Sequence, residues 1–171
     1  MSTFLKGFHI LNSPAAALVA FALFSLTASG SSIAAQGLSL ISPEQSVSIE
    51  KSLQMKGANH KLNTAVLEAA PNIASFLKIN SCLSGNNASS LNIFAAPGKS
   101  YPDNNYSGPL SNMYRHDKSI CATVLRVQGW TMPANNALRF EVVYVADDSG
   151  EAGKSEHEVQ KQSSGEWLFS R

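Results

Sequence analysis

Several large classes of protein are disfavoured by residues that this sequence does not contain. It has only two cysteines in 171 residues, too few for a disulfide-dense scaffold or for a zinc site built from cysteine alone. Thirteen Lys and Arg residues are balanced by twelve Asp and Glu residues, and this formal charge of +1 gives no electrostatic footprint for nucleic acid. With 44% hydrophobic and 15% charged residues the chain is predicted to fold, and its length favours one domain.

Motifs of common cofactor and catalytic sites are absent as well. The sequence contains no phosphate-binding glycine loop, no dinucleotide fingerprint, no His-Glu-x-x-His and no calcium loop. It also has no Gly-x-Ser-x-Gly elbow, so a serine-hydrolase triad has no recognisable nucleophile. We therefore expect no cofactor, no metal and no nucleic-acid partner, and no residue is predicted to be catalytic.

Residues 1–35 have the order of a cleavable secretory signal. Lys6 gives a short positive region, the unbroken apolar run 15–24 follows, and small residues come after it. The apolar core of roughly 12 residues is shorter than the ~20 that span a bilayer as a helix. We expect cleavage after Ala34 or Ala35, and an uncleaved anchor is the alternative.

Cleavage would leave residues 36–41 as a tether and 42–171 as a single α+β domain, with no transmembrane anchor. Export predicts a secreted or periplasmic location, and the alanine-rich apolar core favours a bacterial envelope. In that oxidising compartment the default state of Cys82 and Cys121 is a disulfide. Reactive thiols and a metal pair are the alternatives, although a Cys-x-x-Cys motif is absent.

A capping sequence opens the first predicted helix. Ser42 is a favourable N-cap, Pro43 suits the first helical position, and Gln45 lies three residues after the cap. These residues predict a helix over 43–56, which ends at the following glycine.

Further along the chain, helical patterns give way to turn-forming residues. A second helix is predicted from about Lys61, and it should kink or restart at Pro71, which has no N–H to donate. Its apolar face continues to Cys82, which places this cysteine at a helix end. Residues 91–95 alternate weakly and predict a short strand. The dense cluster of Pro, Gly, Asn and Asp in 96–112 predicts a long irregular loop.

The C-terminal third predicts strands joined by short turns. Four segments carry strand-forming or alternating residues: 119–132, 138–146, 154–162 and 166–169. Turn sequences at 147–150 and 163–165 separate the last three. Sequential strands joined in this way form an antiparallel meander, and helices packed on one face of it give an α+β domain.

The order of N-terminal helices followed by a long antiparallel meander resembles small secreted domains of the cystatin-like or NTF2-like type. The final segment 164–169, with Gly165 and Trp167, is similar to the Gly-x-Trp-aliphatic ending on the last strand of such domains. The resemblance implies N-terminal helices packed on a four-stranded antiparallel sheet. It implies no particular activity, because these folds host isomerases, dehydratases, assembly modules and inhibitors.

One candidate pocket follows from the alternation of the strands. If His157 shares a face with Val159, it points into the concave side of the sheet beside Tyr144, where an enzyme of this type would need an acid/base group. The alternative, which we favour at this point, is an exposed histidine on a polar strand, flanked by Glu156 and Glu158.

Two other polar segments have structural explanations. Asp147 and Asp148 belong to an Asp-Asp-Ser-Gly turn sequence, and no metal partner is evident for them. The Tyr-Arg-His-Asp segment 114–117 is expected to be a solvated loop or strand edge, because neighbouring side chains on a strand face opposite ways and do not form a dyad.

Charged and aromatic residues of the strands are assigned to opposite faces. Arg126 and Arg139 are expected to pair with Glu141 and Glu158 on the exposed face, in cross-strand pairs worth a few tenths of a kcal/mol. An anion-binding pair formed by the two arginines is the alternative. Four aromatic residues are expected in the core: Trp130, Phe140, Trp167 and Phe169.

These observations predict an exported, non-enzymatic binding or accessory module of the cell envelope, whose partner is an unknown protein or small-molecule ligand. The loop 96–112 and the sheet face are the expected contact surfaces. Two alternatives stay open. One is a small-molecule isomerase or hydrolase that uses Tyr144 and His157, and the other is a structural subunit of an envelope complex.

Overall fold

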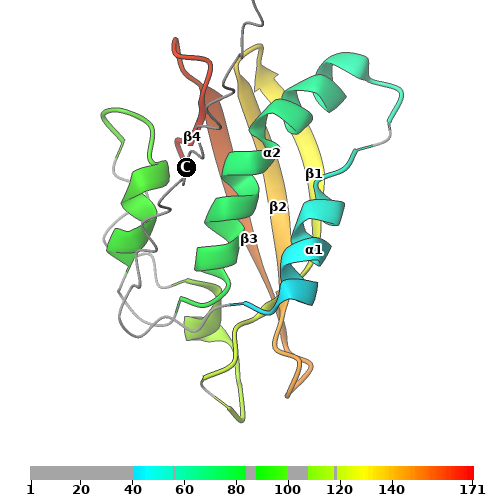
Figure 1. Ribbon diagram of the computed structural model, residues 1–171, viewed down its shortest axis with the longest axis vertical. Coiled ribbons are helices and arrows are strands. Elements are labelled where there is room, and N and C mark those ends of the chain that lie inside the picture. The colour runs from blue at the N-terminus through cyan, green and yellow to red at the C-terminus, as the bar shows by residue number, and fades with distance from the viewer. Residues whose placement is uncertain (1–40, 56, 84–87, 100–107, 118) are drawn as a thin grey trace, which may run out of the picture. The chain divides into compact units, whose positions relative to one another are not determined.

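The computed structural model describes residues 41–55, 57–83, 88–99, 108–117 and 119–171. The predicted secretory signal and nearly all of the predicted tether lie outside this part of the chain. Within it, two α-helices and two short 3₁₀-helices precede four strands, and the helices lie over one face of the sheet (Figure 1).

The sheet is an antiparallel meander, as predicted. It is formed by β1 (Thr123–Ala134), β2 (Ala137–Val145), β3 (Ala152–Lys161) and β4 (Trp167–Phe169), in the spatial order β1-β2-β3-β4. Each strand pairs with its sequence neighbour, because the connecting turns are short. The α+β class and the four-stranded antiparallel sheet are therefore confirmed.

Helix α1 (Pro43–Ser52) begins at the predicted capping box. The Gln45 N–H donates to Ser42 Oγ (3.2 Å), and the Ser42 N–H donates to Gln45 Oε1 (3.0 Å), so two N–H groups at the helix start are satisfied. The helix is four residues shorter than the predicted 43–56. It ends at the C-cap residue Leu53, whose side chain is buried together with that of Ile49.

Helix α2 (His60–Asn80) is one continuous helix that runs through Pro71. The predicted restart at this proline does not occur, but Figure 1 shows that the helix axis changes direction part-way along. Pro71 removes the N–H that would donate to the Leu67 carbonyl. Both residues are exposed, so water can take the place of that donor.

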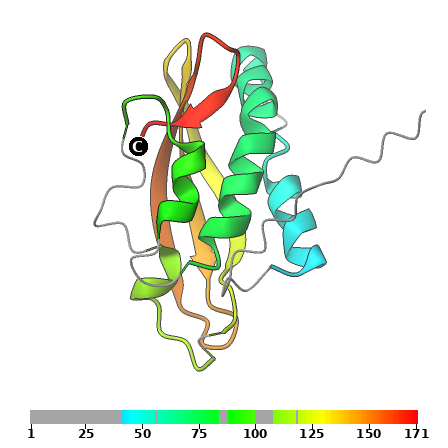
Figure 2. The ribbon, with the colours of Figure 1, turned by 60° about the vertical axis from the view of Figure 1, so that its left-hand side comes forward.

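The core lies between α2 and the inner face of the sheet (Figure 2). Period-two alternation brings one set of strand side chains to this face, and all of them are buried: Val124, Leu138, Phe140, Val142, Tyr144, His157, Val159 and Phe169. Helical periodicity brings the matching set from α2: Val66, Ala69, Ile73, Phe76 and Leu77. The rings of Phe76 and Phe169 stack with their centroids 4.0 Å apart.

The predicted strand at 91–95 is wrong. Residues Ala88–Phe94 form the 3₁₀-helix η1, in which Leu91 and Phe94, three residues apart, are both buried. Only Ala95 makes a bridge to the sheet, parallel to Phe169, and the Ala96 N–H donates to the Phe169 carbonyl (2.7 Å). The burial of Leu91 and Phe94, which lie three residues apart, therefore fits the local structure better than the weak alternation of residues 91–95.

The predicted loop 96–112 is described only in part, because residues 100–107 lie outside the described ranges. Its last residues form a second 3₁₀-helix, η2 (Pro109–Asn112), with Leu110 buried. Gly108 precedes it with φ of 69°, and a Cβ at this position would lie 2.9 Å from Leu83. The loop is therefore anchored to the domain at this end, by a close approach that requires glycine.

Cys82 and Cys121 are joined in a disulfide. Cys82 follows the C-cap residue of α2, as predicted, and Cys121 lies two residues before β1. The Ala122 N–H donates to the Ser81 carbonyl (2.8 Å) beside the bridge. The covalent link thus fixes the end of the core helix to the start of the sheet.

We expect that replacing both cysteines by serine lowers the free energy of unfolding by about 4 kcal/mol, because the bridge closes a loop of about 40 residues in the unfolded chain. Urea unfolding of the oxidised wild type and the Cys82→Ser/Cys121→Ser double variant measures this difference. The reduced wild-type protein is the control, and it should match the variant. A difference well below 1 kcal/mol would mean that the bridge does not form in solution.

Candidate functional site

His157 lies on the inner face of the sheet, and the favoured expectation that it is exposed is wrong. Only 1% of its surface is accessible, whereas its sequence neighbour Glu156 is exposed. The alternation of β3 explains the result, because His157 and Val159 share one face while the neighbouring carboxylates lie on the other. The charges of Glu156 and Glu158 therefore lie on the opposite face of the strand and are not part of the surroundings of His157.

Aromatic rings surround the His157 imidazole. Its centroid lies 5.2 Å from that of Phe76, 5.6 Å from that of Phe140 and 5.8 Å from that of Phe169. Nε2 lies 3.2 Å from Ser155 Oγ. Burial lowers the pKa of His157 from 6.5 to about 3, because the protonated ring loses its hydration in these surroundings. The side chain is therefore a neutral member of the core at ordinary pH.

Tyr144 is fully buried, and its hydroxyl accepts a hydrogen bond from Asn80 Nδ2 at the end of α2 (2.7 Å). In the sheet register Tyr144 lies opposite Gly153, whereas His157 lies opposite Phe140. The two candidate pocket residues thus belong to different cross-strand pairs about 13 Å apart along β2. Neither side chain is open to a substrate in this conformation.

The predicted turn at Asp147–Gly150 is present, and it holds the neighbouring loop. Asp148 Oδ2 accepts hydrogen bonds from the backbone N–H groups of His116 (2.6 Å) and Asp117 (2.8 Å). These bonds lower the pKa of the Asp148 carboxyl, with the bond from Asp117 as the largest cause. Asp148 therefore acts as a fixed acceptor that shapes the loop.

Two further bonds connect the same segments. Ser149 Oγ donates to the Tyr114 carbonyl (2.6 Å), and the Tyr114 N–H donates to Glu151 Oε2. Residues 113–117 and 147–151 together form what we call the loop-end surface. On it Tyr114 is 63% exposed, and its ring meets the His116 ring edge to face, at 5.0 Å between centroids. An exposed aromatic pair is thus held on a hydrogen-bonded frame.

The expected pairing of charges on the outer face of the sheet is only partly found. Arg139 forms an ion pair with Glu158 (3.0 Å). Arg126 instead donates to Gln128, which itself donates to Glu141, and Lys154 is the ion-pair partner of that carboxylate (3.2 Å). These pairs are at the surface and contribute little to stability.

The aromatic residues expected in the core are buried with one exception. Phe140, Trp167 and Phe169 have exposed fractions of 3% or less. Trp130 lies on the edge strand β1, is half-buried, and stacks on Phe140 with 4.6 Å between ring centroids.

Surface clefts formed by described residues include three that lie outside the core, and neither Tyr144 nor His157 lines any of these three. The α2–hairpin cleft, of about 370 Å³, lies between the first turns of α2 and the ends of the strands; its lining includes Lys61, Thr64, Glu68, Met132, Lys161 and Trp167. A groove of about 430 Å³ lies between α1 and α2, and a third cleft of about 390 Å³ lies beside Cys121 and Thr123. Within the described ranges no group of three or more metal-ligating side chains is found.

Comparison with known proteins gives no assignment. No family model, no curated protein and no solved structure matches the sequence. Of the helices in the described part of the chain, none combines the length and the apolar character that crossing a bilayer requires.

The buried neutral histidine makes stability depend on pH. Since folding lowers the pKa of His157 from 6.5 to about 3, the unfolded chain takes up this proton first as the pH falls. The stabilising effect of the neutral ring is complete above pH 6.5. We expect it to decrease by about 2 kcal/mol between pH 7 and pH 5, where the carboxylates are still ionised.

Denaturant unfolding at several pH values in this interval measures the decrease. His157→Leu, which removes the titrating group and keeps a similar volume, should unfold with a flatter pH dependence even if it is less stable at pH 7. His60→Gln, which removes an exposed histidine, is the matched control and should keep the wild-type slope. Equal slopes for the wild type and His157→Leu would show that His157 is not the titrating group.

Proposed function

We propose that the chain is an exported, non-enzymatic binding or accessory module of the cell envelope that acts through its surface. The observation that carries this proposal is the filled inner face of the sheet. Tyr144 and His157 are 0% and 1% exposed, and apolar side chains occupy the space between them and α2. The enzymatic alternative built on these two residues receives no support from their positions, because a substrate would have no access to them.

Export rests on the N-terminal sequence and on the cysteines. The order of charge, apolar run and small residues over 1–35 is that of a secretory signal. The Cys82–Cys121 bridge is consistent with an oxidising compartment. We also propose that the fold is of the cystatin-like or NTF2-like type, since a helix packs across an antiparallel meander that ends in a turn at Gly165 and a short strand at Trp167.

The loop-end surface is the contact surface that we propose. Four hydrogen bonds fix its two segments to each other, so little conformational entropy is lost when a partner binds. It presents the ring of Tyr114, and tyrosine is a residue type enriched in protein interfaces. It also follows directly on the described end of the loop 96–112, which the sequence indicates as a contact region.

We expect the exported protein to begin at Ala35 or Gln36 and to contain one disulfide. Mass spectrometry of the protein recovered from the envelope or the medium should give the mass of residues 35–171 or 36–171, lowered by about 2 Da because each disulfide removes two hydrogens. Reduction should restore those 2 Da. Recovery of the full-length chain from the cytosol, with both thiols free, would contradict the proposal of export.

We expect a photo-crosslinking amino acid at position 114 to give a discrete adduct with a protein of the envelope in intact cells. The same amino acid at position 47, which is equally exposed but lies on α1, is the matched control and should give none. Asp148→Ala removes the acceptor that shapes the loop and should weaken the adduct formed at position 114. An equal adduct pattern at both positions, or none at position 114, would contradict this surface.

A further inference from the structure

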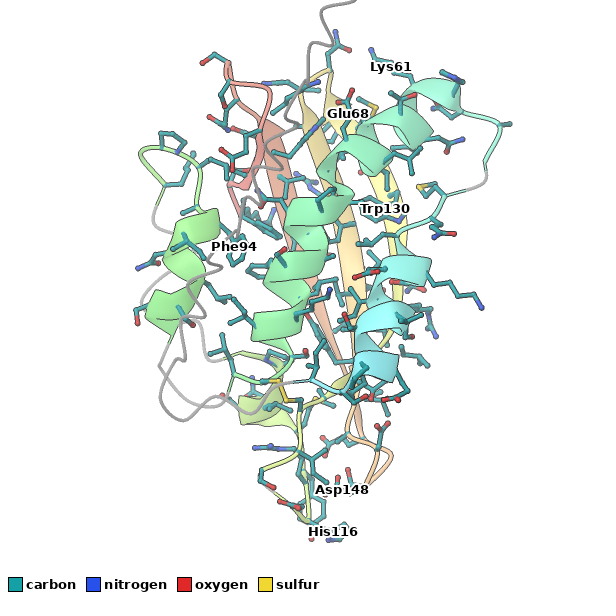
Figure 3. All side chains as sticks on the ribbon, viewed as in Figure 1. Lys61, Glu68, Phe94, His116, Trp130 and Asp148 are labelled. Carbon is teal, nitrogen blue, oxygen red and sulfur yellow. A yellow bond between two sulfur atoms is a disulfide. The ribbon has the colours of Figure 1, made fainter. Side chains whose placement is uncertain are left out.

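We propose that the α2–hairpin cleft binds a small organic anion, a monocarboxylate with an apolar body. This site goes beyond the proposed contact surface and does not depend on it. Figure 3 shows Lys61 and Glu68 at one end of the domain, and His116 and Asp148 at the opposite end.

The cleft is formed where the first turns of α2 and the ends of the strands stand apart, and polar side chains from both reach across the gap. Lys61 Nζ donates to Asn135 Oδ1 in the β1–β2 turn (2.7 Å). Lys161 Nζ at the end of β3 pairs with Glu68 Oε2 on α2 (2.7 Å). These two contacts connect helix and sheet across a space of about 370 Å³, within the range of ligand pockets.

The floor of the cleft is apolar and held in place. It contains Ala65, Met132 and Trp167, of which the tryptophan is only 3% exposed. The indole Nε1–H donates to Glu68 Oε2 (3.4 Å), and the Trp167 carbonyl accepts from Asn72 Nδ2 (2.5 Å). The thioether of Met132 can adjust to the shape of an apolar group. A hydrocarbon body therefore finds a fixed aromatic surface beside an adaptable one.

The charged side chains that line the cleft have a net positive charge, which comes from Lys61. Glu68 balances Lys161, whose bond is the largest cause that lowers the pKa of the Glu68 carboxyl. Lys61, in contrast, donates to a neutral amide oxygen, and the first turn of α2 contains no acidic residue. The Lys61 ammonium is thus the charge that the cleft residues leave unbalanced, and it selects a ligand with one negative group.

The size of the cleft limits the ligand. At about 30 Å³ for each water-sized group, the space holds about a dozen such groups. Octanoate has a suitable size and both required features, so it is the probe of choice. 1-Octanol has the same body without the charge, and acetate has the charge without the body.

The two tryptophans provide the readout. With the indole nitrogens labelled with ¹⁵N, the N–H signal of Trp167 should shift during titration with octanoate, while the signal of Trp130 should not. Trp130→Phe assigns the two signals. We expect octanoate to bind about three- to fivefold more tightly than 1-octanol, as for an exposed charge pair, and acetate to give no saturable shift.

Two cleft variants and one control test the assignment. Lys61→Gln should lower the affinity for octanoate to that for 1-octanol. Thr64→Trp places a large side chain on the exposed rim and should abolish the shift caused by octanoate. Lys78→Gln removes a lysine of the same helix that pairs with Glu50 outside the cleft, and it should bind like the wild type.

Several results would overturn the proposal. One is the absence of any Trp167 shift up to about 10 mM octanoate, where a site with a dissociation constant of about 1 mM is nearly saturated. Others are equal affinities for octanoate and 1-octanol in the wild type, binding of acetate as tight as that of octanoate, or unchanged binding in Lys61→Gln. If Thr64→Trp does not fold, the Lys61→Gln comparison alone decides.

Discussion

The rest of the structure depends on the packing of α2 across the inner face of the sheet through a cluster of rings. Phe76 of the helix stacks on Phe169 of the last strand and meets His157 of β3 edge to face. Burying a phenylalanine contributes about 1.5–3 kcal/mol, and an aromatic pair adds about 0.5–1.5 kcal/mol. Because this cluster and its neighbours fill the inner face, polar side chains that contact a ligand must lie outside it, at the ends, the edges or the outer face of the sheet.

The strands could be predicted from the sequence because two local signals agree. The alternation from Leu138 to Ala146 fixes which side chains face the core, and the turn residues at 147–150 fix where the chain reverses. The capping box at Ser42 is equally local, since its two bonds connect residues three apart. Where the signals disagreed the outcome was set by packing, as at Leu91 and Phe94, whose spacing fits a 3₁₀-helix as well as an irregular strand.

The candidate sites were harder to predict, for two physical reasons. His157 is flanked by two carboxylates, and their charge suggested an exposed strand although the alternation with Val159 placed it in the core. The α2–hairpin cleft draws on residues from 60 to 167, and each of them alone resembles an ordinary surface or core residue. Only the path of α2 over the strand ends brings Lys61, Glu68 and Trp167 together. No local pattern in the sequence indicates that these three residues lie close together.

Strand β4 links the core to the cleft. It has only three residues, and Trp167 and Phe169 share its inner side because side chains two apart face the same way. Phe169 packs in the ring cluster with His157, and Trp167 forms the floor of the cleft. Three register pairs with β3, the bond from Asn72 and the bridge from Ala95 hold the strand. Ala95 lies within the loop that the Cys82–Cys121 disulfide closes. The disulfide and the neutral His157 therefore both support the floor of the cleft, against which the proposed ligand packs.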